Sequence, residues 1–381
     1  MEESNGATKR DPTPPFAPFF ALAALDAIVA VGIWPLALAG VSFPPALDLA
    51  VWHGREMLFG YLGASLAGFF FTALPRWTGR PVPAWAVRLI LVLWLAARLA
   101  PSSGAFAFLA AAPVVALASV VSFQIVAARD RRDFKLAALL WLYAASGMVV
   151  ADPAAGPARD FALRLAIVAL ASLVMIIGGR VVPALTQRFD ALCGETPPTA
   201  ASSRLEGLSL ICAAAGLIFW LVRPEGGAVA AALLAGAAGQ ALRLASWSGR
   251  STAASPPLWG FYAAYAMFPF GFVLLAGSAL SPDAIPQSAG LHVLMVGGFG
   301  GMCLAVKSSM IRRRNNLSFA MSSVGIATAL FWFGAACLRP AASFSGAPDV
   351  WLMAAALAWA TSFVLFLFDF RVPLSGGVVT R

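Results

Sequence analysis

The two histidines of this chain are the residues whose type and placement best fit metal chemistry. His53 and His292 are the only imidazoles among 381 residues, and each falls near the start of a long apolar run. Neutral imidazole is the usual nitrogen ligand of haem iron and of copper, and a polar ring inside an apolar bundle requires a partner. Two such rings at similar depth on facing helices would suit the axial positions of one haem. The competing interpretation is structural, with each ring bonded to a neighbouring group.

The residues that follow His53 could support it as a ligand. In the segment WHGREMLFG, Glu56 lies three residues after His53 and therefore on the same helical face. Its carboxylate could accept the second ring N–H and fix the tautomer. Arg55 either meets a haem propionate or forms an ordinary ion pair with Glu56. We therefore place Arg55 and Glu56 beside His53 in the predicted cofactor site.

The run that contains His292 also carries sulfur. His292 and Met295 share a helical face, and Met302 and Cys303 follow about two turns farther on. Thioether and thiol groups together with an imidazole can hold copper in its Cu(I) state, although Met and Cys also fill apolar cores. Side chains are missing at four nearby positions, which would let another helix or a flat macrocycle approach. These positions are Gly297, Gly298, Gly300 and Gly301.

The elements that must position these residues are transmembrane helices. Hydrophobic residues make up 60% of the chain and charged residues 11%, and the mean hydropathy is +0.83. In hydrocarbon every backbone polar group must be satisfied within the segment, and the apolar runs do not alternate as barrel strands do. We predict an all-α polytopic bundle of about twelve helices. The runs lie near 16–40, 56–75, 83–100, 104–128, 134–151, 161–185, 204–222, 227–247, 258–280, 287–311, 317–338 and 349–370.

The net charge of +9 is explained by membrane topology, so lipid and not nucleic acid is the expected partner. Most basic residues fall at alternate ends of the runs, which predicts that both termini are cytoplasmic. The polar start of the chain is unlike a signal peptide. We expect tails at 1–15 and 372–381 around one transmembrane domain, 16–371. The predicted cytoplasmic set is Lys9, Arg10, Arg76, Arg80, Arg129, Arg131, Arg132, Lys135, Arg188, Arg204, Arg243, Arg250, Arg312, Arg313, Arg314, Arg371 and Arg381, against Arg55, Arg98, Arg159, Arg164, Arg223 and Arg339 outside.

Three of the runs end in related ways. PRWTGRP follows Leu74, GGRVVPALTQR follows Ile177, and KSSMIRRRNN follows Val306. These ends are four runs apart, which indicates three four-helix repeats, although any helix that enters the cytoplasm tends to end in Arg. Arg180 lies inside its run, where it either serves function or snorkels to the interface. No phosphate-binding glycine loop, H-E-x-x-H motif or activated nucleophile is present, so no catalytic residue is assigned, and neither a soluble-type hydrolase nor an ATP-driven pump is expected.

The motifs of this chain resemble those of the NnrS family of bacterial membrane proteins. The resemblance rests on WHGREMLFGYLGASLAGFFFTALPRWTGRP, IIGGRVVPALTQR, RLASW followed by PPLWGFYAAYAMFPFG, and LHVLMVGGFGGM, in this order. It implies a twelve-helix protein of the bacterial inner membrane that binds haem b and copper. It also implies a role in the response to nitric oxide and in denitrification, with nitric oxide or a redox protein as partner.

The chain departs from the family pattern at two histidine positions. His53 and His292 match family histidines, but Arg55 stands where the first motif has a second histidine. Arg312 to Asn316 replace a Gly-His-Thr-Gly-Arg turn. Two imidazoles cannot supply both a bis-histidine haem and a histidine-rich copper site, so a member with haem alone, or without metal, has to be considered.

The placement of the histidines is also similar to the low-spin haem pair in the main subunit of haem–copper oxidases, a twelve-helix fold with threefold pseudosymmetry. The sixth and seventh runs hold no histidine for an oxygen-reducing centre, so oxidase activity is not predicted. Two alternatives without metal stay open. One is a transporter with Arg180 or Glu56 on its pathway, and the other is a scaffold or sensor for a partner membrane enzyme.

Overall fold

The regular structure of the chain is helical throughout the described residues. The computed structural model describes residues 14–43, 48–99, 107–129, 131–152, 154–196, 203–247, 252–314 and 319–374. Most of the predicted tails, 1–15 and 372–381, lies outside these ranges. Fourteen α-helices form twelve rods, because the π-helical segments η1 and η5 join α2 to α3 and α11 to α12. The predicted all-α bundle of twelve helices is therefore confirmed.

The rods follow the predicted runs closely. They are α1 (Ala17–Leu38), α2–η1–α3 (Leu49–Arg55, Glu56–Leu62, Gly63–Thr78), α4 (Ala84–Leu99), α5 (Ala112–Ala127), α6 (Phe134–Ala151), α7 (Ala158–Leu192), α8 (Ser203–Val222), α9 (Gly227–Ser246), α10 (Pro256–Leu280), α11–η5–α12 (Gln287–His292, Val293–Gly300, Gly301–Arg314), α13 (Ser323–Ala341) and α14 (Pro348–Leu374). Short 3-10 helices lie at Ala107–Ala110, Arg131–Asp133, Thr252–Ala254 and Ala342–Phe344.

Ten of these rods are long and apolar enough to cross a membrane. The exceptions, α4 and α5, have 16 residues each and so span about 24 Å, against roughly 30 Å of hydrocarbon. Apolar side chains also point outward, as Val29 of α1 does with 61% of its surface exposed. Such a surface is unfavourable in water and favourable in lipid. The chain is a multi-pass membrane protein.

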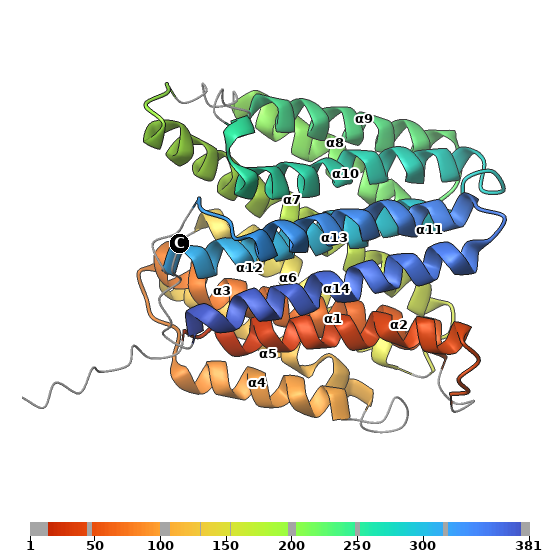
Figure 1. Cartoon of the computed structure of the whole chain (residues 1–381), viewed down its shortest axis with the longest axis horizontal. Helices are drawn as coiled ribbons and strands as arrows, with labels where there is room; N and C mark the ends of the chain where they lie inside the picture. Colours follow the sequence, from red (N-terminus) through yellow and green to blue (C-terminus); the bar gives the residue numbers. More distant parts are fainter. Residues whose placement is uncertain are drawn as a thin grey trace, which may run out of the picture.

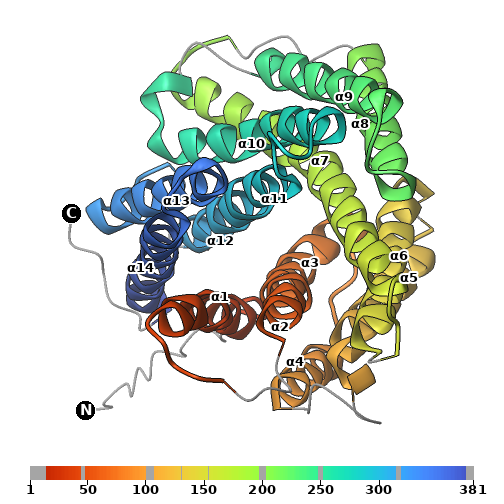
Figure 2. The same cartoon turned by 90° about the vertical axis from the view of Figure 1, so that its right-hand side faces the viewer.

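The rods run side by side along the long axis of the molecule (Figure 1). Seen along that axis they follow one another around a ring, and α14 returns to pack against α1 (Figure 2). The first and last rods of the chain are thus neighbours. The predicted threefold repeat remains a prediction.

The second rod begins earlier than the predicted run at 56–75. Asp48 caps it, because the Asp48 carboxylate accepts hydrogen bonds from the backbone N–H groups of Ala50 and Val51 at 3.0 and 3.1 Å. His53 therefore lies inside a helix and not before one. The prediction missed this extension because Arg55 and Glu56 interrupt the apolar pattern, whereas in the structure they neutralise each other.

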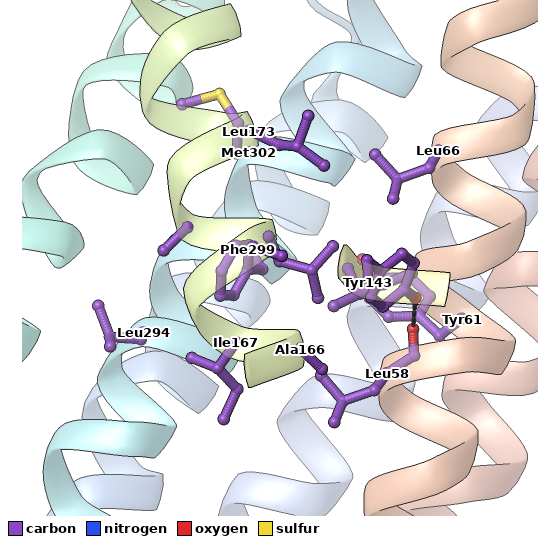
Figure 3. Packing of buried hydrophobic residues seen from close by; sticks show 14 of the residues in the cluster. Leu58, Tyr61, Leu66, Tyr143, Ala166, Ile167, Leu173, Leu294, Phe299 and Met302 are labelled. Atoms are coloured by element: carbon purple, nitrogen blue, oxygen red, sulfur yellow. Dashed lines mark hydrogen bonds between the residues drawn. The ribbon is translucent and has the colours of Figure 1, made fainter. Parts of the chain in front are cut away.

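The two π segments were not predicted, and both contain carbonyl groups that accept hydrogen bonds from side chains. In η1, the Leu58 carbonyl accepts from the Tyr143 hydroxyl (Figure 3), and the Gly60 carbonyl accepts from Trp94 Nε1 at 3.0 Å. In η5, the Val296 carbonyl accepts from Trp332 Nε1 at 2.9 Å. Segments of π-helix often mark functional positions. Here each one begins within three residues after a histidine.

Candidate functional site

His53 is held by the first rod. Its ring nitrogen Nδ1 lies 2.8 Å from the carbonyl oxygen of Ala30 in α1, and its ring meets that of Trp34 edge-on at 5.8 Å. A carbonyl oxygen only accepts, so a neutral His53 carries its proton on Nδ1. Nε2 then keeps its lone pair and is the nitrogen that could bind a metal. The prediction that the Glu56 carboxylate accepts a hydrogen bond from His53 is wrong, because that carboxylate pairs with Arg55 and Arg98.

His292 has the same arrangement within its own helix. Its Nδ1 lies 2.7 Å from the carbonyl oxygen of Ser288, one turn earlier in α11. The same argument assigns the proton to Nδ1 and leaves Nε2 as the free electron-pair donor. The structural interpretation of the histidines thus accounts for Nδ1 of each ring, which is bonded to a neighbouring carbonyl. It does not account for Nε2.

The two histidines lie in one electrostatic neighbourhood. Each ring interacts with the charge of Arg339 from α13, and the two rings interact with each other. These electrostatic interactions link residues that are far apart in the chain, on the second and tenth rods. No sequence pattern indicated that Arg339 joins them, because Arg339 was counted only as an outer basic residue.

A cluster of buried charges lies directly after His53 along the second rod. Arg98 Nη1 of α4 lies 2.9 Å from Glu56 Oε2 and 3.8 Å from Asp26 Oδ2 of α1. Arg55 Nη2 donates to Glu56 Oε1 at 3.1 Å, which confirms the predicted ion pair. Sequence analysis missed Asp26 and the role of Arg98. An acidic residue within an apolar run was the available signal, since charges in lipid need partners.

The predicted copper ligands do not converge on one point. Met302 and Cys303 follow His292 by ten and eleven residues along the same rod, which places them about 15 Å farther along the axis. One ion cannot bridge that distance, so His292 cannot share copper with Met302 or Cys303. Met302 and Cys303 instead line a small interior cavity beside Lys307. No group of three or more His, Cys, Asp or Glu side chains that could hold a metal occurs among the described residues.

Protein side chains occupy the space beside the glycines of the tenth rod. A Cβ atom on Gly301 would lie 2.0 Å from the ring of Trp332, and one on Gly300 would lie 2.7 Å from that of Trp359. The glycines therefore serve close helix packing and not the approach of a macrocycle.

Arg180 is neither buried nor unpaired. Its Nη1 lies 2.6 Å from Asp133 Oδ1, and its guanidinium lies over the ring of Trp77 at 5.9 Å. The side chain reaches the rim of the bundle, as the snorkelling interpretation expected.

Arg243 was wrongly counted among the residues of the cytoplasmic connections. It is buried within α9, where Nε lies 2.6 Å from Glu206 Oε2 and Nη1 donates to the Met175 carbonyl at 2.8 Å and to the Tyr265 hydroxyl at 2.7 Å. These bonds join α7, α8, α9 and α10. Because its charge is paired inside the bundle, Arg243 carries no topological information.

The fold and this site define a multi-pass helical membrane protein with two histidines gathered from its second and tenth rods. The family model described as NnrS protein matches residues 13–376. The match covers nearly the whole chain, and the protein belongs to the NnrS family. A search of curated proteins found no match.

Proposed function

We propose that this protein is a haem-binding NnrS-type protein of the bacterial inner membrane that acts in the response to nitric oxide. His53 and His292 would be the two axial ligands of one haem b. The observation that carries the proposal is their shared bonding pattern. In both rings Nδ1 is bonded to a backbone carbonyl, which orients the ring and leaves Nε2 for a metal.

The surroundings of the two rings fit this group. Arg339 supplies a positive charge close to both imidazoles, and such a charge would complement a haem propionate. Arg55 is committed to Glu56 and is the weaker candidate for that role. A π-helical segment follows each histidine along its rod, as is common at functional positions.

The protein's residues would determine which chemistry is available. Bound haem supplies one-electron transfer, and it binds gases when an axial position is open. If His53 and His292 both held the iron, electron transfer with a redox partner would be favoured over gas binding. The hydrogen bond from His53 to α1 and that from His292 within α11 would resist release of either ring.

The reduced-minus-oxidised absorption spectrum of the detergent-purified protein, with metal analysis of the same sample, tests the proposal. We expect about one low-spin haem b per chain, with loss of the signal in His53→Ala and in His292→Ala. Gly54→Ala is the matched control, because a Cβ there meets nothing within 4 Å. In cells, both histidine variants should lose protection against nitric oxide while still inserting in the membrane. Unchanged haem content and protection in both variants would overturn the proposal.

A further inference from the structure

The three related helix ends meet at one cavity. The cavity has a volume of about 390 Å³ and is lined by Arg76 of α3, Arg180 and Arg188 of α7, and Arg313 of α12. These arginines come from the ends of the second, sixth and tenth rods, where PRWTGRP, GGRVVPALTQR and KSSMIRRRNN occur. The similarity of the three ends therefore has a spatial counterpart, because arginines from all three line the same cavity.

The positive charge of this cavity is largely uncompensated. No acidic side chain lines it, and only Arg180 has an acidic partner, Asp133. Within the described part of the chain, Arg76, Arg188 and Arg313 form no hydrogen bond or ion pair through their side chains, and the charges of Arg76 and Arg188 act unfavourably on that of Arg313. Like charges gathered around a cavity raise the local potential and attract anions.

A further cation, Lys307, lies in the interior of the bundle beside an adjoining cavity. A second cavity shares part of its wall with the first, including Phe69, Ile177 and Val306, and Lys307 lines it. Lys307 is 1% exposed, and its Nζ has no hydrogen-bond acceptor in the described ranges. The nearest aromatic ring is that of Tyr61, at 4.5 Å. The potential of an unpaired buried cation is weakly screened, so Lys307 adds to the attraction for an anion.

The walls between the charges are apolar, with Phe69 and Phe261 among them. A volume of this size matches cavities that hold small organic molecules and exceeds what a bare inorganic ion needs. We propose that the cavity binds an organic anion, whose phosphate or carboxylate group contacts Arg76, Arg188 and Arg313. This ligand could be a phospholipid headgroup or a free organic phosphate. The proposal does not depend on haem.

Two probes distinguish these sources. Native mass spectrometry of the full chain in detergent measures retention of phosphatidylglycerol against phosphatidylcholine, and calorimetric titration measures binding of glycerol 3-phosphate. We expect Arg76→Gln and Arg313→Gln each to weaken binding about tenfold, because each removes a charge-assisted hydrogen bond. Arg88→Gln is the matched control: Arg88 is an exposed arginine of α4 outside the cavity, and its Nε donates to Ala84 of its own helix.

A second variant tests the cavity without removing charge. Ala184 is exposed at the cavity wall, so Ala184→Phe should obstruct the cavity and leave the bundle folded, as checked by helical circular dichroism and by the thermal unfolding midpoint in detergent. Loss of phosphatidylglycerol in these variants identifies a lipid ligand, and loss of glycerol 3-phosphate identifies a soluble one. The proposal would be overturned if the wild type bound neither probe. It would also be overturned if Arg76→Gln, Arg313→Gln and Ala184→Phe all bound both probes as well as the wild type does.

Discussion

Arg98 Nη1 lies 2.9 Å from Glu56 Oε2, and this ion pair joins the end of α4 to the first residue of the η1 segment. Glu56 is buried and Arg98 is largely buried, with 4% and 13% of their side-chain surfaces exposed. The pair explains why Glu56 does not accept a hydrogen bond from His53. It also places a charged contact beside the histidine of the second rod.

Removing one partner of this pair should destabilise the protein strongly. Arg98→Gln would leave the Glu56 and Asp26 carboxylates without their shared cation, at a cost of about 3 kcal/mol. Arg88→Gln in the same helix removes an exposed arginine and should cost little. Thermal unfolding in detergent measures both. Equal midpoints for the two variants would show that the buried pair contributes no stability.

The cluster of Arg98, Glu56 and Asp26 leaves no room for a side chain at Gly60. A Cβ atom there would lie 2.0 Å from Arg98 Nη1 and 2.2 Å from Asp26 Oδ2. Gly60→Ala should therefore displace Arg98 and lower the unfolding temperature, whereas Gly54→Ala on the same rod meets nothing within 4 Å. The comparison controls for helix propensity, since both changes replace Gly by Ala in a helix. A Gly60→Ala protein as stable as Gly54→Ala would contradict the packing.

The indole of Trp332 should stabilise the η5 segment. Trp332→Phe removes the donor to the Val296 carbonyl and leaves a part-buried acceptor without this bond, at a cost of about 1 kcal/mol. Trp141→Phe removes a comparable bond, to Ser122, at an exposed position and should cost less. Hydrogen exchange of the backbone around Val296 should rise only in Trp332→Phe. Unaltered exchange would show that the π segment does not need this bond.

If haem is bound as proposed, replacing one axial ligand should change its reduction potential. His292→Met keeps a side chain able to ligate iron, and exchange of His for Met ligation raises the potential. Redox titration of the purified variant measures the shift, with haem content as the control for occupancy. A variant that retains one haem per chain at an unchanged potential would show that residue 292 is not a ligand.

The charge pattern predicts that both termini are cytoplasmic. A fluorescent protein fused after Arg381 should fold and emit, while alkaline phosphatase fused there should be inactive. Fusions within 281–286, between α10 and α11, should behave in the opposite way, because that connection contains no basic residue. Active alkaline phosphatase at the C-terminus would show that the protein has the opposite orientation in the membrane.

The order and approximate limits of the twelve rods could be predicted from the sequence, because hydrocarbon requires each apolar run to satisfy its own backbone. The ion pair of Arg55 with Glu56 was also predictable, because the two residues are neighbours in the chain. Family membership followed in the same way from separated motifs in a fixed order.

The partners of the functional residues were decided only by tertiary structure. His53 bonds to Ala30 on another rod, Glu56 is bound by Arg98 of α4, and the π segments accept bonds from distant indoles. The helix ends that carry Arg76 and Arg313 are recognisable in the sequence, but their meeting at one cavity is not. Periodicity and hydropathy describe one segment at a time, whereas these contacts depend on which rods become neighbours when the chain closes its ring.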